Sequence, residues 1–231
     1  MKRVVVQELL DSDSGSPEEV VASLADLRWF NRWFGGASTT VSLIHSAANQ
    51  LGLKRLTYLD VACASGDGAL AAQKRLAAEG IDLQVTFLDR SQSHLRGERN
   101  GSRHSAITGD AMNLPFADNT FDLVGNSLFV HHLESLEVER FVTESLRVCR
   151  HAVIINDLRR SCLHWLTALA GTPLYRSRLT RHDAPASVRR AYTASELAHI
   201  LERCPSRRVD FSSHYYFRTG VVIWKDSPQK Q

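Results

Sequence analysis

Two adjacent histidines, His131 and His132, follow an apolar run, Phe121 to Asn126, that has the length of a buried β-strand. Polar residues that follow a strand lie at the carboxyl edge of a parallel sheet, where open α/β folds bind ligands. A neutral imidazole can remove a proton near pH 7, so His131 is the candidate general base. Neighbouring side chains do not easily face the same way, so at most one of the pair is expected to act. The alternative is that both are structural.

A carboxylate, Asp89, stands at the end of an earlier predicted strand, just as the histidines follow the strand at 121–126. The apolar run from Leu83 to Leu88 ends at Asp89, and Arg90 follows. An acidic residue roughly 20–30 residues beyond the turn of a strand–turn–helix unit can accept hydrogen bonds from both hydroxyls of a ribose. We therefore predict that Asp89 binds a ribose; the alternative is a polar residue that only caps a strand end.

The strand–turn–helix unit itself begins with the apolar run Leu56–Val61. Small residues fill positions 62–68, and a helical pattern then continues to Ala78. Small residues let the backbone approach a ligand, the helix N-terminus offers free N–H groups, and Asp67 suits the N-cap position. The turn has neither G-x-G-x-x-G nor G-x-x-x-x-G-K-[ST], which argues against a dinucleotide fold and a phosphate loop.

Two segments resemble class I S-adenosylmethionine (SAM) dependent methyltransferases. The pattern Asp-x-Ala-x-x-Ser-Gly-Asp at 60–67 is similar to the first motif of the ubiquinone/menaquinone C-methyltransferase family. The segment 110–122, Asp-Ala-x-x-Leu-Pro-Phe-x-Asp-Asn-Thr-Phe-Asp, closely matches the same family. Cys63 and Ala64 depart from the pattern, because they stand where the family usually has two glycines and leave less room for the methionine end of the cofactor.

The resemblance implies SAM as the cofactor and suggests which residues bind it. In the family, the residue at position 110 contacts the adenine amino group, and a carboxylate suits an N–H₂ donor. Met112 would then be an apolar cover for the ring. The cofactor-binding residues that we expect are Asp60, Ala62, Cys63, Ala64, Ser65, Asp89, Arg90, Asp110, Ala111, Met112, Asn126, Ser127 and Arg32.

Arg32 belongs to an aromatic-rich segment, 29–34, that precedes the first strand. In many class I methyltransferases this segment covers cofactor and substrate, and an arginine there can meet the cofactor carboxylate; the alternative is core packing. The resemblance also places His131 and His132 where the quinone C-methyltransferases have a substrate-site Arg and an Asn. We expect both histidines at the catalytic site and no metal ion. The expected substrate-binding residues are Trp29, Trp33, His131, Asp157 and Arg159.

Composition and charge restrict the class of protein. The hydrophobic content of 43% and charged content of 23% are ordinary for a globular domain, and no apolar run approaches the ~20 residues of a membrane span. There is no signal-peptide pattern, and the four cysteines have neither C-x-x-C nor zinc spacing, which fits a reducing cytosol and a cytoplasmic protein. Residues 147–208 hold twelve arginines, no lysine and four acidic residues, which indicates an anionic ligand, nucleic acid or a solvated surface.

The alternation of strand and helix patterns predicts one α/β domain. Its Rossmann-like class I methyltransferase sheet should be mostly parallel with a final antiparallel strand and carry helices on both faces. We divide residues 1–231 into an N-terminal helical lid (1–52), a SAM-binding core (53–161), a helical and Arg-rich insertion (162–192) and a C-terminal helix and strand pair (193–231). Within the insertion we expect a helix over 162–170 and then an Arg-rich loop, and a long loop at this edge of a sheet is typically functional.

These features predict a SAM-dependent methyltransferase that acts on an oxygen of a phenolic or polyketide-like small molecule. The alternatives are C-methylation of a quinone precursor, methylation of RNA, and a non-catalytic SAM-binding protein, which Cys63 and Ala64 would allow. Only the Arg-rich segment favours RNA, and an Asn-Pro-Pro-Tyr type of motif is missing after the fourth strand. We therefore expect a small-molecule acceptor, no nucleic acid and no membrane span, and we leave a homodimer open.

Overall fold

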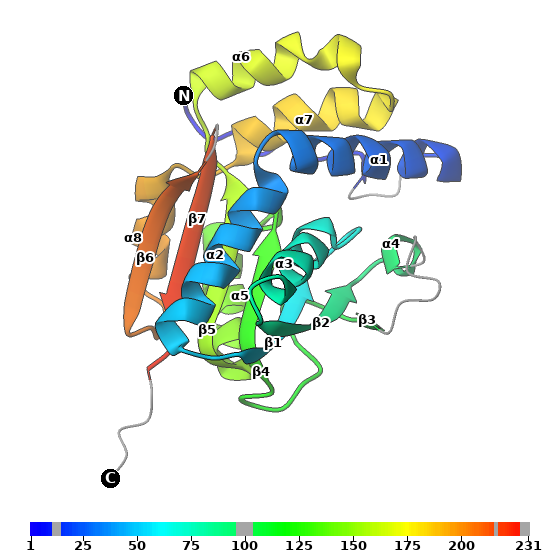
Figure 1. Cartoon of the computed structure of the whole chain (residues 1–231). Coiled ribbons are helices and arrows are strands. Elements are labelled where there is room, and N and C mark those ends of the chain that lie inside the picture. Colours follow the sequence, from blue (N-terminus) through cyan, green and yellow to red (C-terminus); the bar gives the residue numbers. More distant parts are fainter. Residues whose placement is uncertain (11–14, 96–103, 215–216, 227–231) are drawn as a thin grey trace.

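The computed structural model describes residues 1–10, 15–95, 104–214 and 217–226, which contain a seven-stranded sheet in the order β3-β2-β1-β4-β5-β7-β6 (Figure 1). Strands β1 to β5 are parallel, and β7 lies antiparallel between β5 and β6. The strands are β1 (Arg55–Val61), β2 (Asp82–Asp89), β3 (Ser105–Thr108), β4 (Phe121–Ser127), β5 (Cys149–Leu158), β6 (Arg208–His214) and β7 (Arg218–Trp224). The predicted sheet with its antiparallel end is confirmed.

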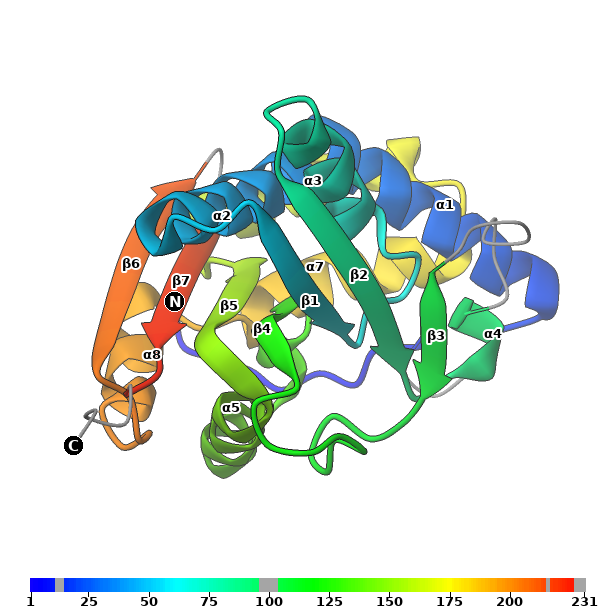
Figure 2. The same cartoon turned by 60° about the horizontal axis from the view of Figure 1, so that its bottom comes forward.

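Helices cover both faces of this sheet (Figure 2). On one face lie α2 (Gly36–Leu51) and α3 (Asp67–Ala77), and on the other lie α5 (Ser135–Val148) and α8 (Ala194–Leu201). Each face buries its own apolar cluster, with Phe87 fully buried in one and Phe141 in the other. Burying a side chain of this size contributes about 1.5–3 kcal/mol, so the two clusters hold the strand ends in fixed positions.

Three helices form a lid over the carboxyl ends of the parallel strands, at the top of Figure 1: α1 (Pro17–Trp33), α6 (Cys162–Ala170) and α7 (Arg178–Arg190). Buried polar contacts join α1 to the start of α7. The carboxylate of Asp26 accepts hydrogen bonds from the main-chain N–H groups of Arg176 and Ser177, at 2.9 and 3.0 Å. The short helices α4 (Gln92–Leu95), η2 (Val130–His132) and η3 (Thr172–Leu174) connect the larger elements.

The helices α1 and α8 each begin with a capping box, and the start of α3 differs from the prediction. Ser16 and Thr193 each form a capping box with the glutamate three residues later. Asp67 is not the N-cap of α3: the N-cap is Gly66, in the left-handed region at φ 69°, and Asp67 is the first helical residue. A glycine adopts that conformation without steric cost, so the tight turn ends one residue earlier than predicted.

The insertion also differs from the prediction in its second half. We expected an Arg-rich loop after residue 170, but residues 178–190 form α7, whose N-cap is Ser177. The N-terminal segment runs along α7: Val4 N–H donates to the carbonyl of Arg189, and the main-chain N–H groups of Leu9 and Leu10 donate to Asp183. The run of Asp, Ser and Gly at 11–16, whose composition predicts a flexible linker, lies mostly outside the described residues. No helix in the described part of the chain is long and apolar enough to cross a membrane.

Candidate active site

The lid and the strand ends enclose a cavity of about 1130 Å³. Its walls include the turns after β1, β2 and β4, the inner face of α1, and parts of α6 and α7. The predicted cofactor residues that line it are Asp60, Ala62, Cys63, Ala64, Ser65, Asp89, Arg90, Asp110, Ala111, Met112 and Ser127. The sequence therefore identified one continuous wall of this cavity.

The turn after β1 has a strained backbone. Ala62 and Ala64 have positive φ values of 52° and 44°, a region that alanine rarely occupies. Two contacts hold the turn against the end of β2: Cys63 N–H donates to the carbonyl of Leu88, and Ala64 N–H donates to the carboxylate of Asp89 at 2.9 Å. Strain of this kind collects at ligand sites, where the surrounding structure fixes it.

Carboxylates at the ends of successive strands share this wall. Asp89 is buried, and its second oxygen accepts a hydrogen bond from Ser91 N–H at 2.9 Å. Asp110 accepts one from Met112 N–H at 2.9 Å, so that oxygen is held beside the turn that carries Met112. Each carboxylate oxygen has two lone pairs, which gives both groups capacity for a ligand hydroxyl or amino group.

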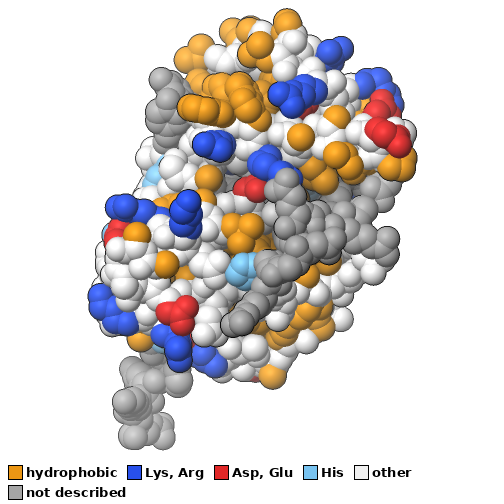
Figure 3. All heavy atoms as spheres, turned by 45° about the vertical axis from the view of Figure 1, so that its right-hand side comes forward, with side chains coloured by type: hydrophobic (Ala, Val, Ile, Leu, Met, Phe, Trp, Pro, Cys, Tyr) orange, Lys and Arg blue, Asp and Glu red, His pale blue; other side chains and the backbone are white. Residues whose placement is uncertain are grey.

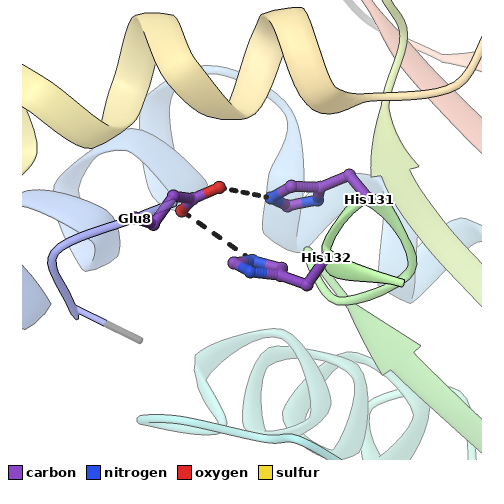
Figure 4. Close-up of side chains that lie close together, drawn as sticks. All are labelled: Glu8, His131 and His132. Atoms are coloured by element: carbon purple, nitrogen blue, oxygen red, sulfur yellow. Dashed lines mark ion pairs between the residues drawn. The ribbon is translucent and has the colours of Figure 1, made fainter. Parts of the chain in front are cut away.

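A second group of polar side chains lies across the cavity, where Glu8 meets the histidine pair (Figure 4). His131 Nε2 is 3.6 Å from Glu8 Oε1, and His132 Nε2 is 3.8 Å from Glu8 Oε2. On its other side, His131 Nδ1 lies 2.7 Å from Asp157 Oδ1. We call Glu8, His131 and His132 the histidine cluster.

The surroundings of His131 determine its protonation. Burial would lower the pKa of this imidazole, but the carboxylates of Asp157 and Glu8 together outweigh burial and raise its pKa to about 10. Without another cation in the cluster, His131 is therefore protonated at neutral pH. Because a general base must be unprotonated, this environment does not favour His131 as the base on its own.

The aromatic segment of α1 turns a different side to the cavity from the one predicted. Phe30 and Phe34 line it, whereas Trp29 and Trp33 lie outside its lining. The side that lines the cavity continues the helical spacing of Leu27, which could have identified the inner face from sequence. Arg32 also lies outside the lining, with its guanidinium over the Trp33 ring.

The outer surface of the lid is also apolar. Hydrophobic side chains gather at the top of the molecule, where α6 lies (Figure 3). The exposed leucines of α6 are Leu163, Leu166 and Leu169, and none of them lines the cavity. Exposure of apolar groups therefore does not by itself distinguish the cavity side of the lid from its outer side.

Three other predicted residues lie behind or beside the cavity lining. Asn126 is buried below the wall, and Asp157 stands behind His131 as its hydrogen-bond partner. Arg159 points away and donates to Ser213 Oγ at 3.4 Å. Asp157 therefore positions a lining residue and does not itself form the wall.

Several lining residues were not predicted from the sequence. Arg218, at the start of β7, is only 4% exposed and donates to Asn31 Oδ1 at 3.1 Å, while its Nη1 has no hydrogen-bond partner among the described residues. Burial lowers the pKa of Arg218 to about 10, although Asp157 acts against this, so the guanidinium is still charged at neutral pH. His164 stacks on Phe217 at 4.6 Å, and burial lowers its pKa to about 4.

Residues 59–155 match a family of proteins described as a methyltransferase domain. Among curated proteins, a demethylmenaquinone methyltransferase of Lactiplantibacillus plantarum is 36% identical over 37% of this chain and 35% of its own. A fatty-acid O-methyltransferase of Mycolicibacterium smegmatis is 33% identical over 58% of this chain and 50% of its own. The matches thus span half or less of these relatives.

Solved structures resemble the chain over a longer stretch. Human N-acetylserotonin methyltransferase, solved in complex with SAM, superimposes with a TM-score of 0.65 at 10% identity. That match covers 88% of this chain and 55% of the human one. Residues 59–155 therefore resemble a methyltransferase domain, and the chain has the fold of the class I SAM-dependent methyltransferases.

Proposed function

We propose that this chain is a SAM-dependent methyltransferase that methylates an oxygen atom of a phenolic or polyketide-like small molecule. The observation that carries the proposal is a single cavity, which joins the carboxylates at the strand ends to the histidine cluster. At about 1130 Å³ it is larger than most single-ligand pockets, so it can hold a cofactor and an acceptor together.

The residues on the cofactor side fit SAM chemically. Asp89 can accept hydrogen bonds from ribose hydroxyls, and Asp110 can accept one from the adenine amino group. The strained turn at Ala62 and Ala64 has only small side chains, which lets the backbone come close to a ligand. SAM, when bound, supplies a methyl group already activated on sulfur, so alignment and exclusion of water are the main tasks of the protein.

The acceptor side combines an apolar lining with a few polar groups. Phe30 and Phe34 can pack against an aromatic or alkyl body, and Arg218 can pair with an anionic group on it. The proton of the acceptor hydroxyl would pass to the histidine cluster. Because Asp157 and Glu8 hold a proton on His131, we assign this role to the cluster, and no longer to His131 alone.

Methylation at carbon is the second candidate reaction. Its support is the name demethylmenaquinone methyltransferase, which several relatives carry, and the sequence motif at 110–122. The two reactions differ in product: an O-methyl ether or ester can be cleaved chemically, whereas a C-methyl group cannot. Product analysis by mass spectrometry and NMR therefore separates them directly.

The arginines of the 147–208 segment support a small acceptor over RNA. Arg160 is buried and donates to Glu196 and to the carbonyl of Ala191, and Arg190 donates to the carbonyl of His132. These contacts use the guanidinium groups inside the fold. The four cysteines are free thiols, which suits the proposed cytoplasmic location.

The test has two steps. Calorimetry with SAM should show one binding site per chain, and a screen of phenols, hydroxy acids and carboxylic acids with methyl-labelled SAM should then identify an acceptor. Loss of SAM binding in Asp89→Ala, with a retained fold, would support the cofactor site. If SAM does not bind the wild-type protein, the proposal is wrong.

A further inference from the structure

We propose that Glu8, His131 and His132 form a binding site for a divalent transition-metal ion, and that Asp157 positions His131 for it. The sequence alone predicted no metal site, because Glu8 lies far from the histidines along the chain. The fold brings its carboxylate to both imidazoles (Figure 4). Within the described residues, this is the group of three potential ligands whose donor atoms all lie within 4.8 Å of one another.

The distances suit ligands that share an ion. The two Nε2–carboxylate separations, 3.6 and 3.8 Å, are longer than a hydrogen bond of about 3 Å. Donor atoms that each lie ~2.0–2.2 Å from one metal are about 3–4 Å from each other, as simple triangle geometry requires. The three side chains thus surround a point that an ion can occupy with little movement.

The environment of His131 is that of an oriented metal ligand. Asp157 accepts hydrogen bonds from both the ring Nδ1, at 2.7 Å, and the main-chain N–H of the same residue, at 2.9 Å. This fixes the ring and leaves Nε2 directed at Glu8. A carboxylate behind a ligating histidine is the usual arrangement in metal sites, where it sets the tautomer and strengthens the ligand.

The N-terminal segment that carries Glu8 is held on both sides of this residue. Before it, Arg3 donates to the carbonyls of Leu133 and Arg190, at 2.9 and 2.7 Å. After it, the carboxylate of Asp183 on α7 accepts from the N–H groups of Leu9 and Leu10 at 2.8 and 3.0 Å. Glu8 is only 6% exposed, so the fold places a carboxylate at this point in advance of any ligand.

The donor set indicates the class of ion. Two imidazoles and one carboxylate suit Zn²⁺, Mn²⁺, Co²⁺ or Fe²⁺ better than Mg²⁺ or Ca²⁺, which prefer oxygen ligands alone. Three protein ligands leave coordination positions for a ligand from the cavity, which all three residues line. With the ion bound, the lone pairs of these three ligands would be occupied, so the histidine cluster would no longer accept the proton directly. The ion would instead take a lone pair of the acceptor oxygen and lower the pKa of its hydroxyl, whose proton would leave to water. The role of the ion in activating the acceptor rests on the proposed function, whereas binding of the ion does not depend on it.

Metal binding is tested on the full chain after treatment with EDTA and dialysis. Zn²⁺, Mn²⁺ and Co²⁺ are titrated by calorimetry, bound metal is counted by mass spectrometry, and the visible absorption of the Co²⁺ form reports its coordination. We expect one ion per chain. Glu8→Gln and His132→Ala should each weaken binding at least tenfold, and Asp157→Asn by about 10–100-fold.

The matched control is His45→Ala, which removes a histidine that pairs with Glu79 at 2.6 Å on the surface. This variant should bind the ion as the wild type does. Circular dichroism verifies that each variant is folded. If His132→Ala does not fold, His132→Gln replaces it in the metal titration. No stoichiometric ion, or equal affinity in Glu8→Gln and wild type, overturns the proposal. SAM affinity is measured separately on the EDTA-treated protein, so failure of the metal site is distinguishable from failure of the cofactor site.

Discussion

The main-chain N–H of Ala64 donates a hydrogen bond to the carboxylate of Asp89 at 2.9 Å, which ties the turn after β1 to the end of β2. The other oxygen of the same carboxylate accepts from Ser91 N–H. One buried side chain therefore fixes the turn and also faces the cavity. Substitutions at either residue should affect both stability and ligand binding, in proportions that can be measured.

Asp89→Ala should weaken SAM binding at least tenfold and lower the free energy of unfolding by about 1–3 kcal/mol. Removing the carboxylate leaves two N–H groups without an acceptor in a buried place. Calorimetry and urea denaturation measure the two effects. Asp82→Ala, at the exposed start of the same strand, is the control and should change SAM affinity little. Wild-type SAM affinity in Asp89→Ala would refute the ribose assignment.

Ala64→Gly and Ala64→Val should have opposite effects. A side chain at φ 44° costs about 1–2 kcal/mol, so glycine should be tolerated and can raise the melting temperature. Valine is β-branched and should destabilise the turn, and it should also weaken SAM binding because residue 64 lines the cavity. Thermal denaturation with and without SAM tests both variants. Normal SAM binding by the valine variant would show that this turn does not contact the cofactor.

Most residues that the sequence assigned to the cofactor line one cavity, and their positions could be predicted because the signals are local. Each strand is an apolar run, and the polar residue that follows it must lie at the carboxyl edge of the sheet. Asp89, Asp110 and Ser127 could therefore be placed without knowing how the strands pair. The same reasoning located the histidine pair beyond β4, although it could not show what surrounds each ring.

The acceptor wall was harder to predict because long-range packing decides it. Glu8 reaches the histidines only because the N-terminal segment runs along α7, a helix that the sequence analysis described as a loop. Arg218 begins a strand of otherwise apolar and small residues, and nothing in that pattern shows that its guanidinium faces a cavity. For α1, a run of adjacent aromatics does not by itself separate Trp29 from Phe30, and the helical spacing from Leu27 is the signal that the prediction missed.

Nucleic acid should bind weakly in spite of the Arg-rich segment. Each phosphate contact by an arginine contributes a salt slope of about −0.9, but Arg160 and Arg190 are engaged within the fold. We expect no complex with RNA or DNA tighter than about 10⁻⁵ M at physiological salt. A gel-shift titration at several salt concentrations measures this. A tighter complex with a steep salt dependence would instead favour RNA methylation.

Of the four thiols, Cys162 should react first with iodoacetamide. It is exposed at the start of α6, whereas Cys63, Cys149 and Cys204 are buried. Burial raises the pKa of Cys149 to about 12 and that of Cys204 to about 11, so few of these thiols are ionised at pH 8. Mass spectrometry of briefly labelled protein should show one modification, which Cys162→Ser removes. Equal labelling of several cysteines would contradict the buried positions.

The two histidines should differ in their effect on stability. His131 is 3% exposed and pairs with the buried Asp157, so His131→Ala leaves that carboxylate with main-chain N–H partners but without its charged partner, and it should cost about 3–5 kcal/mol. His132→Ala breaks no buried pair with Asp157 and should cost much less. Urea denaturation of both variants compares them directly.

A double variant isolates the cause of this difference. In the background of Asp157→Asn, an amide replaces the buried carboxylate, so removing His131 should cost less than it does in the wild type. The difference between the two costs is the coupling between His131 and Asp157, and we expect it to be at least 1 kcal/mol for a contact in one network.

Turnover with an identified acceptor should fall about 10²–10⁴-fold in both single histidine variants, while SAM affinity stays within a few-fold. Near-normal turnover in both would mean that alignment alone performs the reaction and that the histidine cluster has no part in it.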